Sequence, residues 1–233
     1  MTAFTLDPAD LAALLCARVC HDIISPVGAI INGLEVLDEE KDAEMRGFAL
    51  DLIRKSAEQV SARLQFCRLA FGAAGSAGAA IDTRDAEVAA RGIFDGYRTE
   101  LKWNAPALMM PKNQVKLILN LCLIAASAVA RGGAIEVNVS GLEEARRIKV
   151  SAIGKNPRLP SGVWQFLTGT AGEAPSTPQH VQAYFAGLVA KAASIRLSVA
   201  EEYETVAFEA LPLAMEESAE SCASGTGALS SLS

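Results

Sequence analysis

Apolar residues recur at steps of three and four along two runs in the first third of the chain, which is the spacing of one helix face. The first run contains Leu11, Leu15, Val19, Ile23, Val27, Ile30, Leu34 and Leu37. Asp7 is placed to cap this helix, and Pro8 to occupy its first position. After a charged turn over residues 38–42, the second run contains Met45, Ala49, Leu52, Ile53, Ser56, Val60, Leu64, Cys67 and Phe71. The pattern predicts a helical hairpin over residues 1–75.

The apolar stripes of this hairpin are too wide for two helices to bury by themselves. The simplest additional surface is a second copy of the same hairpin. We therefore expect a homodimer that is held together by a four-helix bundle.

The pattern changes at residues 72–80, where the small residues GAAGSAGAA predict a flexible junction. Beyond it, the spacing predicts helices over 84–94, 113–129 and 178–193. It also predicts extended segments near Leu101 and over 135–139, 148–152, 195–200 and 205–211. A turn is expected over 141–144 and a loop over 157–178. These elements predict an α/β domain over 76–212 and a disordered tail over 213–233, and therefore an α + α/β fold class.

The composition excludes several classes of protein. Apolar residues make up 51% of the chain and charged residues 21%, which is unlike a disordered protein. The 21 basic and 27 acidic residues give a net charge of -6, so no nucleic-acid partner is expected. The longest apolar stretch, 117–130, is shorter than the roughly 20 residues of a bilayer span, and the first residues lack the positive charges of a signal peptide. We expect a cytoplasmic protein that does not bind a membrane.

His21 lies on the side of the first helix that faces away from the apolar stripe, so the pattern predicts a solvent-exposed imidazole. At neutral pH an exposed ring offers a nucleophilic nitrogen, which suits phosphoryl acceptance. The small and polar side chains around it would let a partner protein approach. The predicted docking residues are Ala17, Arg18, Ile24, Ser25, Gly28, Ile31 and Asn32. Cys16 and Cys20 beside this histidine would form only half of a zinc site, and the sequence has no second pair to complete it.

Residues 21–26 read HDIISP. This order resembles the H-box of two-component sensor kinases, in which an acid follows the histidine and a proline stands five positions further on. Asp22 could accept a hydrogen bond from one ring nitrogen and so set the tautomer, while Pro26 removes a backbone hydrogen bond and can bend the helix. A surface histidine beside a surface aspartate, with a proline that only kinks the helix, remains the alternative.

The second half of the chain resembles the Bergerat-type ATP-binding domain of the same kinases, with its nucleotide-binding boxes altered. Residues 111–126 resemble the N-box helix, where Asn120 matches the first asparagine and Ile124 stands at the magnesium-binding position. In the box that follows a strand, Ala152 replaces the nucleotide-reading aspartate, and Asn156 replaces the second glycine. Residues 177–187 lack a glycine-rich lid that could cradle phosphates. The resemblance therefore predicts a retained fold that has lost ATP binding.

Together, the hairpin and the altered domain resemble the dimeric bacterial histidine phosphotransferases of the ChpT type, over residues 1–212. This resemblance implies that His21 accepts a phosphoryl group from the receiver aspartate of a hybrid sensor kinase and passes it to response-regulator receivers. It also implies that Asp22 orients the imidazole, and that the receiver supplies Mg²⁺, so that the chain needs no cofactor or metal of its own. Two other functions stay open: an ATP-dependent sensor-kinase core, and a non-catalytic adaptor that binds receivers.

Overall fold

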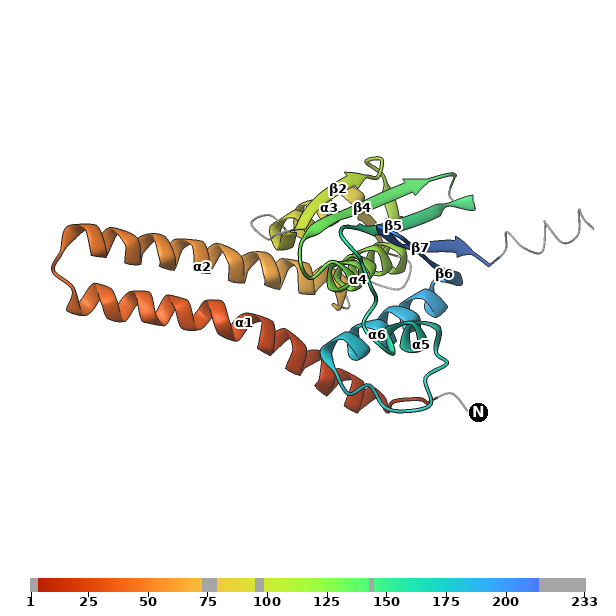
Figure 1. Ribbon diagram of the computed structural model, residues 1–233, viewed down its shortest axis with the longest axis horizontal. Helices are drawn as coiled ribbons and strands as arrows, with labels where there is room; N and C mark the ends of the chain where they lie inside the picture. Colours follow the sequence, from red (N-terminus) through yellow and green to blue (C-terminus); the bar gives the residue numbers. More distant parts are fainter. Residues whose placement is uncertain (1–3, 73–78, 95–98, 143–144, 214–233) are drawn as a thin grey trace, which may run out of the picture.

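The computed structural model describes residues 4–72, 79–94, 99–142 and 145–213. A long helical hairpin projects from an α/β domain, as Figure 1 shows. The predicted junction at 72–80 and the boundary between residues 75 and 76 lie largely outside the described residues, and so do residues 143–144 of the predicted turn and nearly all of the predicted tail. The predicted combination of a helical N-terminal part and an α/β sheet domain is confirmed.

The hairpin consists of α1 (Pro8–Glu39) and α2 (Ala43–Ala70), each with an aspartate cap. The Asp7 carboxylate accepts a hydrogen bond from the Ala9 N–H at 2.8 Å, and Asp42 accepts from the first turn of α2 at 3.0 Å. Near the far end of the hairpin the two helices approach closely at Gly33, where an added Cβ would lie 2.7 Å from Ile53 Cγ1. The predicted cap and both predicted helices are therefore present.

The α/β domain is built on a five-stranded sheet in the order β2-β4-β5-β7-β6. Its strands are β2 (Thr99–Asn104), β4 (Gly133–Ser140), β5 (Arg147–Ile153), β6 (Ile195–Glu202) and β7 (Thr205–Pro212). Strands β2 and β4 are parallel, and the other neighbours are antiparallel. In the register Val137 pairs with Val150, which pairs with Phe208, and all three side chains are buried.

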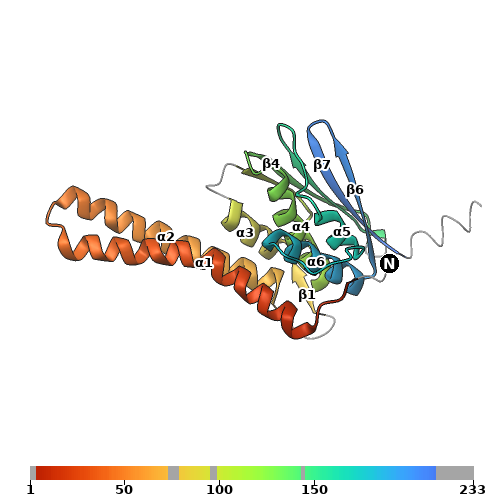
Figure 2. The same cartoon turned by 60° about the horizontal axis from the view of Figure 1, so that its bottom comes forward.

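Helices cover one face of this sheet, as Figure 2 shows. They are α3 (Thr83–Phe94), α4 (Lys112–Ala128) and α6 (Pro178–Ala192). The apolar residues that alternate along the strands point toward these helices, and together they form the core of the domain.

Three short elements were not predicted. Strands β1 (Ala80–Asp82) and β3 (Met109–Pro111) pair antiparallel, and each is too short for its alternation to be recognised. Helix α5 (Val163–Thr168) lies inside the segment predicted as a loop, so that prediction is wrong for these residues. Two glycines with positive φ, Gly162 and Gly169, bracket α5, and three of its apolar side chains are buried. Tertiary burial stabilises this helix, because six residues are too few for helix propensity to do so.

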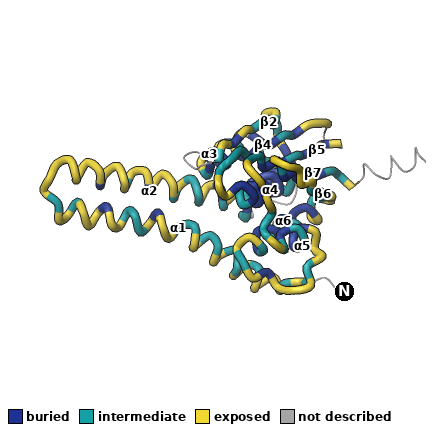
Figure 3. The backbone as a smooth tube through the Cα atoms, viewed as in Figure 1, coloured by how far each residue is buried: buried dark blue, intermediate teal, exposed yellow. Residues whose placement is uncertain are grey.

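The hairpin leaves a large part of its apolar stripe uncovered in the single chain, as the exposed colouring along both helices in Figure 3 indicates. More than a third of each of these side chains is exposed: Val27, Leu34, Met45, Leu52 and Leu64. All five belong to the apolar stripes that the periodicity indicated, which were predicted to be too wide for two helices to bury. The exposed apolar stripe is defined here as these five residues.

Helix α1 also corrects one expectation about membranes. By length and composition it is apolar enough to cross a bilayer, whereas the sequence pattern had considered only residues 117–130. Long apolar helices of soluble bundles have the same composition, because they bury their apolar side chains against other helices.

A buried polar cluster joins the hairpin to the domain. Asn120, fully buried on α4, donates through Nδ2 to the carbonyl oxygen of Ala70 at the end of α2 (3.0 Å) and to that of Lys116 (2.7 Å). Its Oδ1 accepts a hydrogen bond from Gln182 on α6. The residue that matches the N-box asparagine therefore holds three helices together in this chain.

We expect replacement of Asn120 by alanine to lower the free energy of unfolding by about 2–4 kcal/mol, because the Ala70 carbonyl and the Gln182 amide would both lose a buried partner. Urea denaturation would measure the change. Asn104→Ala is the matched control, since that side chain hydrogen-bonds Glu136 and Asn138 in an exposed position, and it should cost less than about 1 kcal/mol. Equal losses in the two variants would contradict a linking role for Asn120.

Candidate functional site

His21 lies in the middle of α1 with 82% of its side chain exposed, as its position opposite the apolar stripe predicted. Its Nδ1 lies 3.3 Å from Asp22 Oδ1. With the proton on Nδ1, the Asp22 carboxylate accepts this hydrogen bond, and the lone pair of Nε2 is left toward solvent. The pair therefore has the geometry of an oriented, accessible nucleophile.

Most of the predicted docking residues share the surface around His21. Ala17, Ile24, Ser25, Ile31 and Asn32 are exposed, and Ile24 is 68% exposed. Gly28 is half-buried, but a Cβ added there would meet no atom within 4 Å. The structure thus places six of the seven predicted docking residues on an open helix surface with small and apolar side chains.

Arg18 is oriented differently from the prediction. Its Nη1 donates to the carbonyl oxygen of Pro178, the first residue of α6, at 2.8 Å. Burial lowers the pKa of the Arg18 guanidinium, and the nearby Asp22 carboxylate partly offsets this effect. Arg18 therefore joins α1 to the α/β domain, because α6 lies close to this edge of the helix, which a wheel of a single helix does not show.

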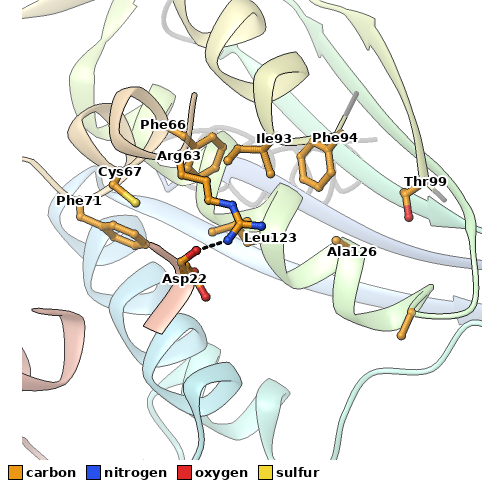
Figure 4. A pocket seen from close by; sticks show the side chains of 11 residues that line it. Asp22, Arg63, Phe66, Cys67, Phe71, Ile93, Phe94, Thr99, Leu123 and Ala126 are labelled. Carbon is orange, nitrogen blue, oxygen red and sulfur yellow. Dashed lines mark hydrogen bonds between the residues drawn. The ribbon is translucent and has the colours of Figure 1, made fainter. Parts of the chain in front are cut away.

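A cavity of about 290 Å³ lies beside Asp22, between the hairpin and the α/β domain, as Figure 4 shows. Its lining is mostly apolar, and it consists of Phe66, Phe71, Ile93, Phe94, Leu123, Ala126 and Ala130 together with Asp22, Arg63, Cys67 and Thr99. Burial, reinforced by the Asp22 carboxylate, raises the pKa of the Cys67 thiol to about 11. Cys67 therefore stays protonated at neutral pH.

Arg63 is the residue of this region that the sequence analysis missed. It extends from α2 and donates a hydrogen bond to the backbone carbonyl oxygen of Asp22, the dashed line in Figure 4. The sequence held one signal for such a contact. In a regular helix the N–H of residue 26 would donate to the Asp22 carbonyl oxygen, but Pro26 has no N–H, so that oxygen needs another donor. The residue that donates in place of the missing N–H depends on how α2 packs against α1.

Two of the positions that match the nucleotide boxes are filled by apolar side chains. Ile124 and Ala152 are both buried in the core. The cavity beside Ile124 measures about 70 Å³, and Arg18 and Gln182 contribute to its lining. This space is far below the roughly 300–1,000 Å³ of pockets that hold drug-sized ligands.

His180, the second histidine, has a packing role. Its ring stacks on Phe166 with centroids 4.6 Å apart, and its Nε2 lies 2.8 Å from the Ser161 carbonyl oxygen. It therefore holds the beginning of α6 against α5 and against Ser161, two residues before α5.

Comparison with known proteins identifies the family. The model of the histidine phosphotransferase C-terminal domain matches residues 83–205. The protein phosphotransferase ChpT of Brucella abortus (strain 2308) is 44% identical over 206 residues, which cover 88% of this chain and 97% of the relative. The chain belongs to the histidine phosphotransferase family. A solved bacterial phosphotransferase is 41% identical with a TM-score of 0.80, and the match covers 90% of this chain and 100% of that one.

This histidine phosphotransferase resembles its relatives over more than the C-terminal domain, because 206 aligned residues must include much of the hairpin. The family inferred from the H-box and the altered nucleotide boxes is therefore confirmed, and the protein is a phosphotransferase. Histidine kinases match at lower similarity. The histidine kinase domain of the Erythrobacter litoralis blue-light activated kinase is 14% identical with a TM-score of 0.43, and the match covers 82% of this chain and 98% of that one.

Proposed function

We propose that His21 of this histidine phosphotransferase accepts a phosphoryl group from the aspartyl phosphate of a hybrid sensor kinase receiver and passes it to response-regulator receivers. The observation that carries the proposal is the 82% exposed imidazole whose Nδ1 lies beside Asp22 Oδ1. A nucleophile that is both oriented and open suits transfer between two proteins, since the second protein must bring its own reacting group to within about 3–3.5 Å.

The chemical step needs only this ring from the chain. In the forward direction His21 Nε2 attacks the phosphorus of the receiver's aspartyl phosphate, an N–P bond forms, the acyl O–P bond breaks, and the receiver's carboxylate leaves. The positive charge that develops on the ring is stabilised by the Asp22 carboxylate that accepts the Nδ1 hydrogen bond. Transfer to a second receiver reverses these steps.

The receiver would dock on the surface formed by Ala17, Ile24, Ser25, Gly28, Ile31 and Asn32 around His21. Exposed apolar area at Ile24 and Ile31 favours a protein partner, because burying such side chains contributes about 25 cal/mol per Å². Phosphoryl transfer also requires charge neutralisation, which we assign to Mg²⁺ and a basic residue of the receiver. We propose no resident cofactor or metal for this chain.

We propose further that the α/β domain does not bind ATP. This rests on the apolar Ile124 and Ala152 at the positions that match the metal- and nucleotide-binding residues, and on the small volume of the cavity beside Ile124. The retained fold then serves to hold the hairpin through Asn120 and Arg18.

We also propose a cytoplasmic homodimer in which the exposed apolar stripe of one hairpin packs against that of a second copy. Five partly exposed apolar side chains at helical spacing favour burial in a four-helix bundle. In such a dimer the apolar side chains of α1 are buried against protein, and this burial accounts for the apolar composition of the helix without a membrane.

Two labelling reactions test the proposed function. In one, the protein is incubated with a receiver domain that carries a labelled aspartyl phosphate; in the other, it is incubated with labelled ATP and Mg²⁺. We expect acid-labile label from the receiver and none from ATP. Label from ATP would instead make the chain a kinase, and no label from either source would favour a non-catalytic adaptor.

A further inference from the structure

One backbone carbonyl next to the phosphoacceptor lacks its helical partner. In an α-helix the carbonyl oxygen of residue 22 accepts a hydrogen bond from the N–H of residue 26. Residue 26 of this chain is proline, inside α1, and proline has no N–H. The Pro26 ring also pushes this carbonyl away from the helix axis, so the oxygen of Asp22 needs a donor from elsewhere.

Arg63 of α2 is that donor. Its guanidinium bonds the Asp22 carbonyl oxygen across the hairpin. Pro26 is buried, and the donor that reaches the Asp22 carbonyl comes from α2, so the gap in the hydrogen-bond ladder faces α2 rather than solvent. Arg63 is itself half-buried and lines the 290 Å³ cavity, where water competes less for its protons than at an open surface.

We propose that Arg63 is a positioning residue of the phosphotransfer site: it replaces the helical hydrogen bond that Pro26 removes and so holds the turn that carries His21 and Asp22 in one conformation. The inference rests on the proposed role of His21. Its physical basis is that a turn without this bond would rotate about the kink and move the imidazole out of line with the incoming phosphorus, and a small displacement is costly for an in-line transfer.

The test uses the coupling between Arg63 and Pro26. Arg63→Met keeps most of the apolar stem and removes the donors, and Arg63→Lys keeps one cationic donor. In Pro26→Ala the N–H returns, and the Asp22 carbonyl regains its helical partner. A positioning role predicts that Arg63 matters when residue 26 is proline and hardly matters when it is alanine, whereas a packing role would be independent of residue 26.

We expect Arg63→Met to lower the rate of phosphoryl acceptance at saturating receiver about tenfold, with less than about a twofold change in the receiver concentration at half-saturation. Arg63→Lys should retain most of the rate. Pro26→Ala/Arg63→Met should lie within about twofold of Pro26→Ala alone. Arg54→Met is the matched control on α2, because Arg54 is exposed and pairs with Asp51, and it should leave the rate unchanged.

Amide hydrogen exchange over residues 21–27 provides a readout that does not depend on activity. Exchange should be faster in Arg63→Met than in the wild type. In Pro26→Ala/Arg63→Met it should be no faster than in Pro26→Ala alone. A wild-type rate and exchange pattern in Arg63→Met, or an equal loss with and without Pro26, would overturn the inference. If the wild-type protein accepts no label at all, the proposed function fails, and the exchange data still decide whether Arg63 holds the turn.

Discussion

Replacement of His21 by alanine is expected to reduce the labelling of this protein by a phosphorylated receiver at least about a thousandfold, to background. The expectation follows from the proposed role of the ring as the nucleophile, since no transfer takes place without an atom to accept the phosphorus. His21 is 82% exposed, so its removal leaves the core and the fold intact. The measurement is the time course of acid-labile label on the variant and the wild type at equal receiver concentration.

The chain offers a matched control in its other histidine. His180 packs on Phe166 and contacts the Ser161 carbonyl, away from the exposed surface of α1. His180→Gln keeps a hydrogen-bonding side chain there and should accept label at the wild-type rate. Label on His21→Ala, or its loss from His180→Gln in a folded protein, would show that the acceptor is not His21.

The second large effect is expected on assembly. Leu34→Glu/Leu52→Glu should convert the proposed dimer to a monomer and weaken association more than about a hundredfold. Each dimer would then place four carboxylates in an apolar interface, and a buried unpaired charge costs several kcal/mol. The two side chains are 49% and 44% exposed in the single chain, so the substitutions do not disturb the core of the protomer. Sedimentation equilibrium would measure the change in mass.

Leu142→Glu is the control for this experiment. Leu142 is 85% exposed and lies just after β4, on the α/β domain rather than the hairpin. The single carboxylate added there should leave the mass unchanged. A wild-type protein that sediments at the mass of one chain would contradict the dimer, and the exposed apolar stripe would then need another partner.

Local signals in the sequence were sufficient for the long elements. The step of three and four through Leu11 to Leu37 predicts α1, and Asp7 with Pro8 predicts its start, because helix caps and periodicity depend on neighbouring residues only. The alternation of Ile135, Val137 and Val139 predicts β4 in the same way. The exposure of His21 also followed from its position on the helix wheel.

Other features depended on contacts between segments far apart in the chain. Helix α5 and strands β1 and β3 are too short for a periodic signal, and burial against the domain stabilises them. The wheel placed Arg18 with the docking residues, but the carbonyl of Pro178 draws it toward α6. Asn120 matched a nucleotide-binding asparagine, yet its amide joins Ala70 to Gln182.

The sequence by itself determined that one histidine lies exposed beside an acid, the residue that we propose as the nucleophile, because the histidine, its neighbouring acid and its helix surface are all encoded within a few turns. Only the tertiary structure decided how that turn is held. Pro26 shows in the sequence that a hydrogen bond is missing, but the donor comes from α2, where the packing of the hairpin brings Arg63 to the Asp22 carbonyl. Hydrogen bonds between distant segments depend on the positions of whole helices, and a one-dimensional pattern does not contain those positions.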